Sequence, residues 1–177
     1  GIYAPTLRYH DGTFYIITTA IYVDAKTKKH GGNNFIITAT DPAGPWSDPV
    51  VVQGAPGIDP DLFFDEDGRL WYTGQQKPKD PEFIDQKEIW MQELNLETFQ
   101  LMGERYHLWR GACDGVWTEG PHIYKNEGRY YLMIAEGGTS FNHAVMVAAS
   151  DKLTGPYVSN ARNPIFTSRQ LSYENWV

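Results

Sequence analysis

The sequence predicts an all-β protein that forms about three blades of a β-propeller. Three observations lead to this prediction. One pattern occurs three times along the 177 residues. Each copy contains short runs of β-branched and aromatic residues, separated by turns rich in Gly and Pro. No stretch has the spacing of a long amphipathic helix, so four short strands per repeat, the content of one propeller blade, account for the pattern best.

The first half of each repeat has the pattern of a β-hairpin that begins with a proline. The three copies lie at residues 4–17, 59–72 and 120–133. Each contains an Asp-Gly or Glu-Gly pair, which supplies the positive φ that a tight turn between two strands needs. We therefore expect two antiparallel strands in each copy.

The second half of each repeat holds another pair of strands. Residues 35–40, 89–94 and 144–149 form the apolar run of a third strand. Polar turns at residues 40–46 and 150–157 resemble each other and lead into an outer fourth strand. These four strands complete one blade.

The repeats divide the chain into the units 1–56, 57–116 and 117–177, which we treat as one partial catalytic propeller domain. Closed propellers typically contain 4 to 8 blades, because closure removes the open edges of the sheets. Three units form only an arc. We therefore expect the chain to be part of a longer protein whose further blades complete the ring.

Composition and charge exclude several classes of function. The 22 Asp and Glu residues outnumber the 15 Lys and Arg residues, which gives a net charge of −7, and no basic run offers a surface for phosphates. A nucleic-acid partner is therefore not expected. No apolar run approaches the roughly 20 residues of a membrane span. The single cysteine, Cys113, excludes an internal disulfide and is expected to pack as a small residue.

Two carboxylates occupy matching places in the second and third repeats. Asp59 directly precedes Pro60, the proline of the second repeat. Glu119 lies two residues before Pro121, the proline of the third repeat. Because the inner strands of all blades begin at one mouth of the central channel, we expect both side chains there. Burial and mutual repulsion would raise their pKa values, which suits Glu119 to act as the general acid of glycoside hydrolysis. The alternatives are a routine Asp-Pro turn and a solvated glutamate.

Two further residues are candidates for substrate binding. His143 follows a glycine-rich segment in the same blade as Glu119, where it could border a pocket. Tyr3 precedes the proline of the first repeat and could offer an aromatic face to a sugar ring. Their structural alternatives are a hydrogen-bonded surface histidine and an aromatic residue packed between blades.

No motif predicts a metal site. Residues 65–68 resemble a calcium loop, but a phenylalanine replaces the oxygen ligand two residues earlier, so a hairpin turn is expected. Glu119 and His122 have the spacing of a metal-binding helix. The intervening Gly120 and Pro121 prevent that helix.

The motifs at the starts of the repeats resemble a known family. The segments GIYAPT, GIDPDLFFD and TEGPHIYK, at residues 1–6, 57–65 and 118–125, are similar to successive blades of glycoside hydrolase family 43. The segment AEGGT, at residues 135–139, resembles the xylosidase-type branch of that family. This resemblance spans nearly the whole chain and implies a five-bladed propeller, of which the chain holds about three blades.

The resemblance also implies roles for individual residues. Glu119 is expected to be the general acid, and Asp59 the auxiliary residue that orients it and tunes its pKa. The family's general base is an Asp expected upstream of Gly1, so we expect the chain alone to be inactive. The family requires no cofactor and is compatible with a structural calcium ion in the channel of the intact propeller.

The expected function is the hydrolysis of xylosidic or arabinofuranosidic bonds in plant hemicellulose by an inverting mechanism. The expected partners are an oligosaccharide or polysaccharide substrate and the missing blades of the same protein. An arabinan-cleaving relative, a non-catalytic carbohydrate-binding propeller and a protein-docking propeller are the alternatives. A secreted, a periplasmic and a cytoplasmic location all agree with the sequence.

Overall fold

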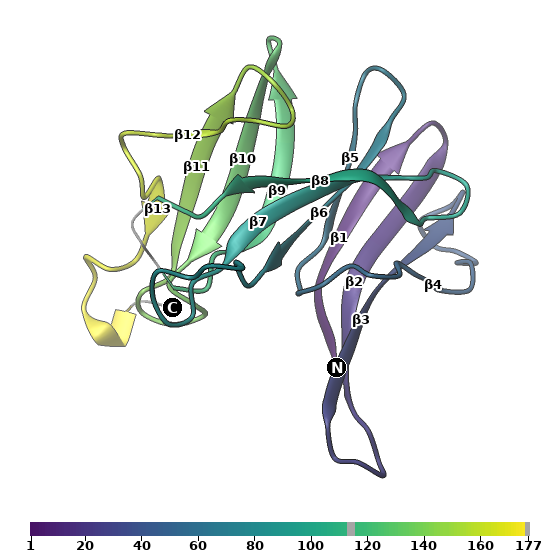
Figure 1. Ribbon diagram of the computed structural model, residues 1–177, viewed down its shortest axis with the longest axis horizontal. Coiled ribbons are helices and arrows are strands. Elements are labelled where there is room, and N and C mark those ends of the chain that lie inside the picture. Colours follow the sequence, from purple (N-terminus) through teal and green to yellow (C-terminus); the bar gives the residue numbers. More distant parts are fainter. Residues whose placement is uncertain (113–115, 176–177) are drawn as a thin grey trace.

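The computed structural model describes residues 1–112 and 116–175, and it consists almost entirely of β-strands (Figure 1). The strands form three antiparallel sheets, which we call blades I, II and III. Blade I contains β1 (Ile2–His10), β2 (Thr13–Val23), β3 (His30–Ala39) and β4 (Val50–Val51). Blade II contains β5 (Asp61–Phe64), β6 (Leu70–Gln76), β7 (Glu88–Leu94) and β8 (Leu101–Trp109). Blade III contains β9 (Glu119–Asn126), β10 (Arg129–Glu136), β11 (Ala144–Ser150) and β12 (Val158–Ser159), with β13 (Phe166–Thr167) also paired to β11.

A short 3-10 helix, η1 (Tyr173–Asn175), follows the last strand. No helix in the described part of the chain is long and apolar enough to cross a membrane. The prediction for Cys113 concerns a residue outside the described ranges.

The predicted hairpins are present as β1–β2, β5–β6 and β9–β10. Residues 11–12 and 127–128 all have positive φ, as two-residue hairpin turns require. The turn between β5 and β6 is longer, because the last paired residues of this hairpin are Phe64 and Leu70. The predicted third strands are present as β3, β7 and β11.

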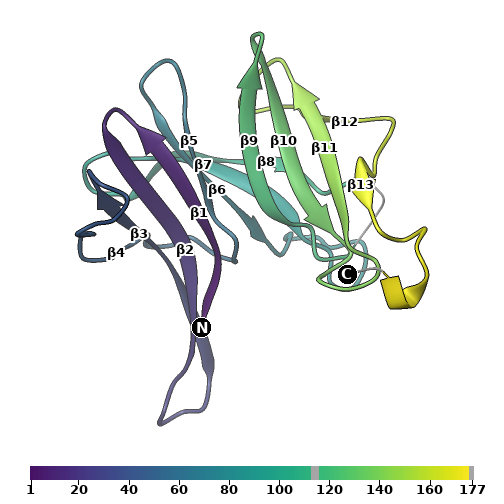
Figure 2. The same ribbon diagram turned by 180° about the vertical axis from the view of Figure 1, so that it is seen from behind.

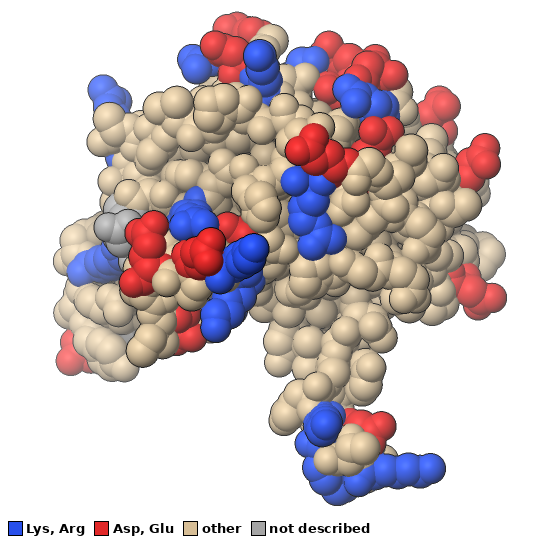
Figure 3. Space-filling model, viewed as in Figure 1, with Lys and Arg blue, Asp and Glu red and all other residues tan. Residues whose placement is uncertain are grey.

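Blade I contains an arm that the sequence analysis did not predict. The strands β2 and β3 stay paired as far as Val23 and His30, and Figure 1 shows them extending beyond the rest of the protein. The turn at the tip is fixed by the Asp24 carboxylate, which accepts the backbone N–H of Thr27 at 2.6 Å. Positively charged side chains gather at this tip (Figure 3). They belong to Lys26, Lys28 and Lys29.

Two hydrophobic clusters fill the spaces between neighbouring blades. The cluster between blades I and II includes Ile17, Ile36, Leu62, Leu70, Tyr72 and Trp90. The cluster between blades II and III includes Trp71, Ile89, Met91, Leu132, Ile134 and Met146. Along β6, side chains enter the two clusters alternately, as the period of two in a strand requires. Blade II is therefore buried on both faces.

Blades I and III each expose apolar side chains. Leu7 and Tyr9 of β1 are 56% and 63% exposed. Val158 of β12 and Phe166 of β13 are each 70% exposed. Exposed apolar residues gathered on a sheet mark a surface that another element commonly covers.

The strands β1, β5 and β9 are the innermost strands of the three blades. β1 contacts β5, and β5 contacts β9. The arrowheads of β1 and β9 point in the same direction (Figure 2), so the first residues of these strands share one end of the fold. We call this end the mouth. It is the place where the sequence analysis expected Asp59 and Glu119.

Candidate active site

The residue before the repeat's proline has a left-handed backbone in every blade. The φ angle is 39° at Ala4, 55° at Asp59 and 57° at Gly120. The repeat position of Asp59 is therefore occupied by Gly120 in blade III, and Glu119 lies one residue earlier. A left-handed conformation is unfavourable for a residue with a Cβ atom. Asp is one of the residues that best tolerate it, so the left-handed backbone at Asp59 is a feature of the repeat that this residue type suits.

Asp59 is partly buried at the mouth. Loss of water around its carboxyl group raises its pKa above the usual value. The backbone N–H of Gly120 and the charge of His122 favour the ionised form and offset part of this rise. Asp59 is thus in contact with the beginning of β9, the strand that carries Glu119.

The segment before Asp59 is held by Asn34 of β3. The Asn34 side chain is buried, and its Nδ2 atom donates to the carbonyl groups of Ala55 and Gly57, each at 3.3 Å. The same nitrogen lies 2.8 Å from the hydroxyl of Tyr72 in β6. Burial raises the pKa of Tyr72, and the nearby charge of Asp59 adds to the rise. Blade I therefore fixes the path of the chain into Asp59 of blade II.

Glu119 is the first residue of β9 and is partly buried. Desolvation raises the pKa of its carboxyl group, and the charge of Asp59 raises it further. His143 and Lys87 act in the opposite direction. The charges of Asp59, His143 and Lys87 thus all act on Glu119, and Lys87 is a residue that the sequence analysis did not identify.

The chain leading to Glu119 is supported from two sides. The N–H of Trp117 donates to the carbonyl of Asp85, in the loop between β6 and β7, at 3.2 Å. The N–H of Gly137, after β10, donates to the carbonyl of Val116 at 3.0 Å. Two loops therefore border Glu119, and one of them contains Lys87.

His143 lies at the end of the glycine-rich loop, just before β11. Its Nδ1 atom is 2.8 Å from the carbonyl oxygen of Gly138, a contact in which Nδ1–H is the donor. Thr167 of β13 donates its hydroxyl to the His143 carbonyl at 2.9 Å. These bonds fix the imidazole on the loop beside Glu119.

Tyr3 lies near the beginning of β1 and is 48% exposed. Its carbonyl accepts a hydrogen bond from the Thr18 hydroxyl at 2.7 Å. Within the described residues, no hydrogen bond or ring contact joins Tyr3 to Asp59 or Glu119. The structure therefore places Tyr3 on the inner strand β1, with its side chain exposed.

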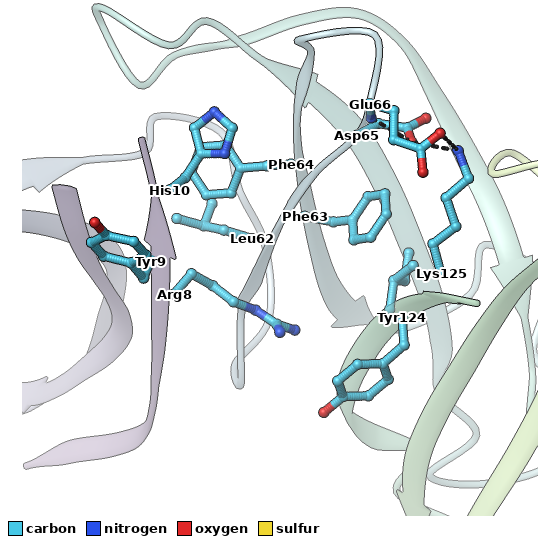
Figure 4. A pocket seen from close by; sticks show the side chains of 11 residues that line it. Arg8, Tyr9, His10, Leu62, Phe63, Phe64, Asp65, Glu66, Tyr124 and Lys125 are labelled. Atoms are coloured by element: carbon cyan, nitrogen blue, oxygen red, sulfur yellow. Dashed lines mark hydrogen bonds and ion pairs between the residues drawn. The ribbon is translucent and has the colours of Figure 1, made fainter. Parts of the chain in front are cut away.

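The sequence analysis missed a second cluster of polar side chains, which lies on the inner strands. Arg8 of β1 binds the carboxylate of Asp61 in β5, and His122 of β9 approaches the same carboxylate. Arg8 extends toward Tyr124 of β9 (Figure 4), with its guanidinium carbon 5.4 Å from the ring centre. A signal was present: Asp61 and His122 directly follow the repeat's proline, and Arg8 and Tyr124 occupy the position two residues later. The period of two places these positions on one face of the inner strands.

The residues described do not supply a calcium site. Within residues 1–112 and 116–175, no group of three or more His, Cys, Asp or Glu side chains is arranged to hold a metal ion. The buried carboxylate of Asp61 is already bound by Arg8 and His122. Calcium in the channel of an intact propeller stays a prediction for residues outside this chain.

Three radially arranged antiparallel sheets, two of four strands and one of five, define the described part of the chain as part of a β-propeller, and two neighbouring carboxyl groups with raised pKa values mark its mouth. The family model for glycosyl hydrolases family 43 matches residues 1–177. The chain belongs to this family.

Relatives with known names agree with this assignment. The chain is 50% identical over 175 residues to a xylosidase/arabinosidase of Butyrivibrio fibrisolvens, and the match covers 97% of the chain and 32% of that protein. It is 41% identical over 178 residues to a putative beta-xylosidase of Escherichia coli K12, covering 97% of the chain and 31% of the relative. The chain thus spans about a third of the length of these curated relatives.

Solved structures show the same fold. The xylan beta-1,4-xylosidase from Bacillus halodurans C-125 superposes with a TM-score of 0.83 at 38% identity, covering 97% of the chain and 32% of that structure. A GH43_12 protein from the capybara gut metagenome superposes with a TM-score of 0.86 at 39% identity, covering 96% of the chain and 32% of that structure. The three sheets match part of the five-bladed propellers of the family, which confirms the predicted fold class.

Proposed function

We propose that the protein containing this chain hydrolyses β-xylosidic or α-L-arabinofuranosidic bonds of plant hemicellulose, with inversion at the anomeric carbon. Family membership and the names of the relatives support this substrate class. The observation that carries the proposal is the position of Asp59 beside Glu119, where its charge raises the pKa of Glu119. A carboxyl group with such a pKa can stay protonated at a pH where an exposed glutamate has lost its proton.

In the proposed reaction, Glu119 is the general acid. A water molecule, deprotonated by a carboxylate outside this chain, attacks the anomeric carbon from the face opposite the leaving group. As the glycosidic bond breaks, Glu119 gives its proton to the leaving oxygen, so that the products are a sugar and an alcohol. The acid and the base of an inverting enzyme stand roughly 6.5 to 9.5 Å apart, which leaves room for the water.

Three further residues have supporting roles in this proposal. Asp59 stays ionised and keeps Glu119 protonated by repulsion. His143 is fixed on its loop by its bond to the Gly138 carbonyl, and its Nε2 atom can accept a hydrogen bond from a substrate hydroxyl. Tyr3 offers an exposed aromatic face on β1 for a more distant sugar ring.

The 177 residues alone are proposed to be inactive, because the general base is assigned to a segment outside them. The exposed apolar side chains of blades I and III support the same conclusion, because further blades of the protein would cover them. Activity should therefore be measured with the full-length protein.

The decisive experiment compares two substrates in the full-length protein and its Glu119→Gln variant. Cleavage of xylobiose, whose leaving group needs a proton, is expected to fall by about 10²- to 10⁴-fold. Cleavage of an aryl xyloside with an acidic phenol is expected to fall much less. An equal loss on both substrates would contradict the role of Glu119 as the acid. Binding of xylo-oligosaccharides by a wild-type protein that hydrolyses neither substrate would instead favour a non-catalytic carbohydrate-binding propeller.

A further inference from the structure

A single buried carboxylate joins the inner strands of all three blades. Asp61, the first residue of β5, has a side chain that is only 1% exposed. Its Oδ1 atom accepts the Nε–H of Arg8 at 2.8 Å and the backbone N–H of Leu62 at 2.7 Å. Its Oδ2 atom is bound by the Nη2 of Arg8 and lies 3.2 Å from the Nδ1 of His122. We call Arg8, Asp61 and His122 the channel cluster.

Short, stiff links join the channel cluster to the two carboxyl groups at the mouth. Asp61 is separated from Asp59 by one proline, and His122 follows Glu119 after a Gly-Pro pair. Because proline fixes its own φ angle, a shift of Asp61 or His122 is transmitted to the beginning of its strand. The cluster therefore helps to set the position of β9 relative to β5 near the end of these strands at which Asp59 and Glu119 lie.

His122 also acts on Asp59 through space. When the imidazole is protonated, its charge favours the ionised form of the Asp59 carboxyl group. The imidazole is partly exposed, at 32%, toward a cavity of about 290 Å³ that Arg8 and Tyr124 also line. The contact with Asp61 is the ion pair that holds the ring. A histidine without this contact could turn into the cavity and away from Asp59.

The same strands carry a second ion pair that provides a natural comparison. Lys125, near the end of β9, binds Asp65 and Glu66, at the end of β5, with distances of 3.3 and 2.9 Å (Figure 4). This pair also connects blades II and III. It lies at the opposite end of the strands from the mouth, so it can stabilise the fold without affecting Asp59.

We propose that Asp61 and His122 are positioning residues for the acid pair: Asp61 fixes the imidazole, and the imidazole keeps Asp59 charged and in place beside Glu119. This inference rests on the proposed function. The groups that act on Asp59 are the N–H of Gly120 and the charge of His122, with the Tyr72 hydroxyl also nearby. The groups that act on Glu119 are Asp59, His143 and Lys87.

The sign of the expected effect is specific. Without the His122 charge, Asp59 binds a proton more readily, so its pKa rises. A neutral Asp59 no longer repels the charge of Glu119, so the pKa of Glu119 falls. The two carboxyl groups should therefore shift in opposite directions. A general loosening of the fold would expose both groups to water and lower both pKa values.

The test uses His122→Asn in the full-length protein, because the asparagine amide can keep a bond to Asp61 while the charge is lost. The side-chain carboxyl carbons are titrated by ¹³C NMR, with the two signals assigned by their loss in Asp59→Asn and Glu119→Gln. We expect opposite shifts of about half a pH unit or more. Asp61→Asn should produce the same pair of shifts. The matched control, Lys125→Met, should lower the unfolding temperature and leave both titrations unchanged.

Activity gives a second readout that separates this inference from the proposed function. The alkaline limb of kcat/KM on xylobiose should move to lower pH in His122→Asn and stay in place in Lys125→Met. Unchanged titrations in His122→Asn, or two shifts in the same direction, would overturn the positioning role. If the NMR shifts appear in a protein without glycosidase activity, the proposed function fails and the positioning of the pair stands.

Discussion

Asp59 and Glu119 lie at the mouth ends of neighbouring inner strands, where the charge of Asp59 raises the pKa of Glu119. Each group is also raised by partial burial. Two adjacent carboxyl groups that both lose water are unfavourable for the folded state. A site of this kind is useful when one group must hold a proton and the other must stay charged.

Removal of the Asp59 charge should change the pH dependence of catalysis. In Asp59→Asn, the repulsion that raises the pKa of Glu119 is lost, so the pKa of Glu119 falls. The proposed acid, Glu119, must be protonated to act, so the alkaline limb of kcat/KM should move to lower pH, by about one unit. Asparagine tolerates the left-handed φ of 55° at this position, which keeps the backbone intact.

The measurement is a pH profile of the full-length protein with xylobiose, recorded beside its thermal unfolding at each pH. An alkaline limb that stays in place in a folded Asp59→Asn protein would remove Asp59 from its tuning role.

The approach of blade II to the mouth depends on Gly57. Its φ is 82°, and a Cβ atom there would lie 1.7 Å from the backbone carbonyl oxygen of Gln75. Gly57→Ala should therefore lower the free energy of unfolding by more than about 2 kcal/mol, through strain and displacement of the backbone. Activity should fall as well, because the displaced segment carries Asp59.

Gly54 is the matched control, because its φ is 73° and a Cβ atom there would meet open space. Gly54→Ala should cost only about 1 kcal/mol, the penalty of the left-handed backbone itself. Urea unfolding of the two variants separates the effects. Equal destabilisation would show that the close contact with Gln75 contributes nothing.

Asn34 should be important for both stability and activity. Asn34→Ala removes the donor to the Ala55 and Gly57 carbonyls and leaves the Thr19 hydroxyl without its acceptor. Buried polar groups left without partners typically cost about 1 to 3 kcal/mol. We therefore expect a loss of this size in urea unfolding, together with reduced kcat.

The neighbouring Asn33 is exposed on the same strand and serves as the control. Asn33→Ala should change neither property. If Asn34→Ala behaved in the same way, the hydrogen bonds of Asn34 would not be what holds the segment before Asp59.

The sequence predicted the architecture because the hairpins repeat in the chain with their prolines and turn glycines. The paired strands and the two-residue turns at 11–12 and 127–128 follow from local chemistry alone. The long arm of blade I could not be predicted in this way, because the residues that extend β2 and β3 to Val23 and His30 have no counterpart in the other repeats. Local pairing, without a repeat or a core contact, determines its length.

The site was only partly predictable for a different reason. The positions of Asp59 and Glu119 within their repeats predicted that both lie where the inner strands begin. This prediction needs only the register within each blade. The contacts of Asp61 with Arg8 and His122 depend on the register between blades, which side chains such as Trp71 and Tyr72 determine by packing. No single-strand pattern contains that information. Lys87 was missed because its charge acts on Glu119 from an irregular loop.

The raised pKa of Glu119 also predicts an effect on stability. Because the folded protein binds this proton more tightly than the unfolded chain, ionisation of Glu119 destabilises the fold as the pH rises above the usual pKa of 4.5. Glu119→Gln removes this penalty, so the variant should unfold at a higher temperature than the wild type at pH 7 to 8. The gain should shrink as the pH falls toward about 4.5 and disappear below it, where Glu119 is protonated in both states. Glu97→Gln, on an exposed turn, is the control and should show no such gain. A Glu119→Gln protein that is less stable than the wild type at neutral pH would show that the ionised carboxylate is favourably bound, which contradicts its role as a desolvated acid.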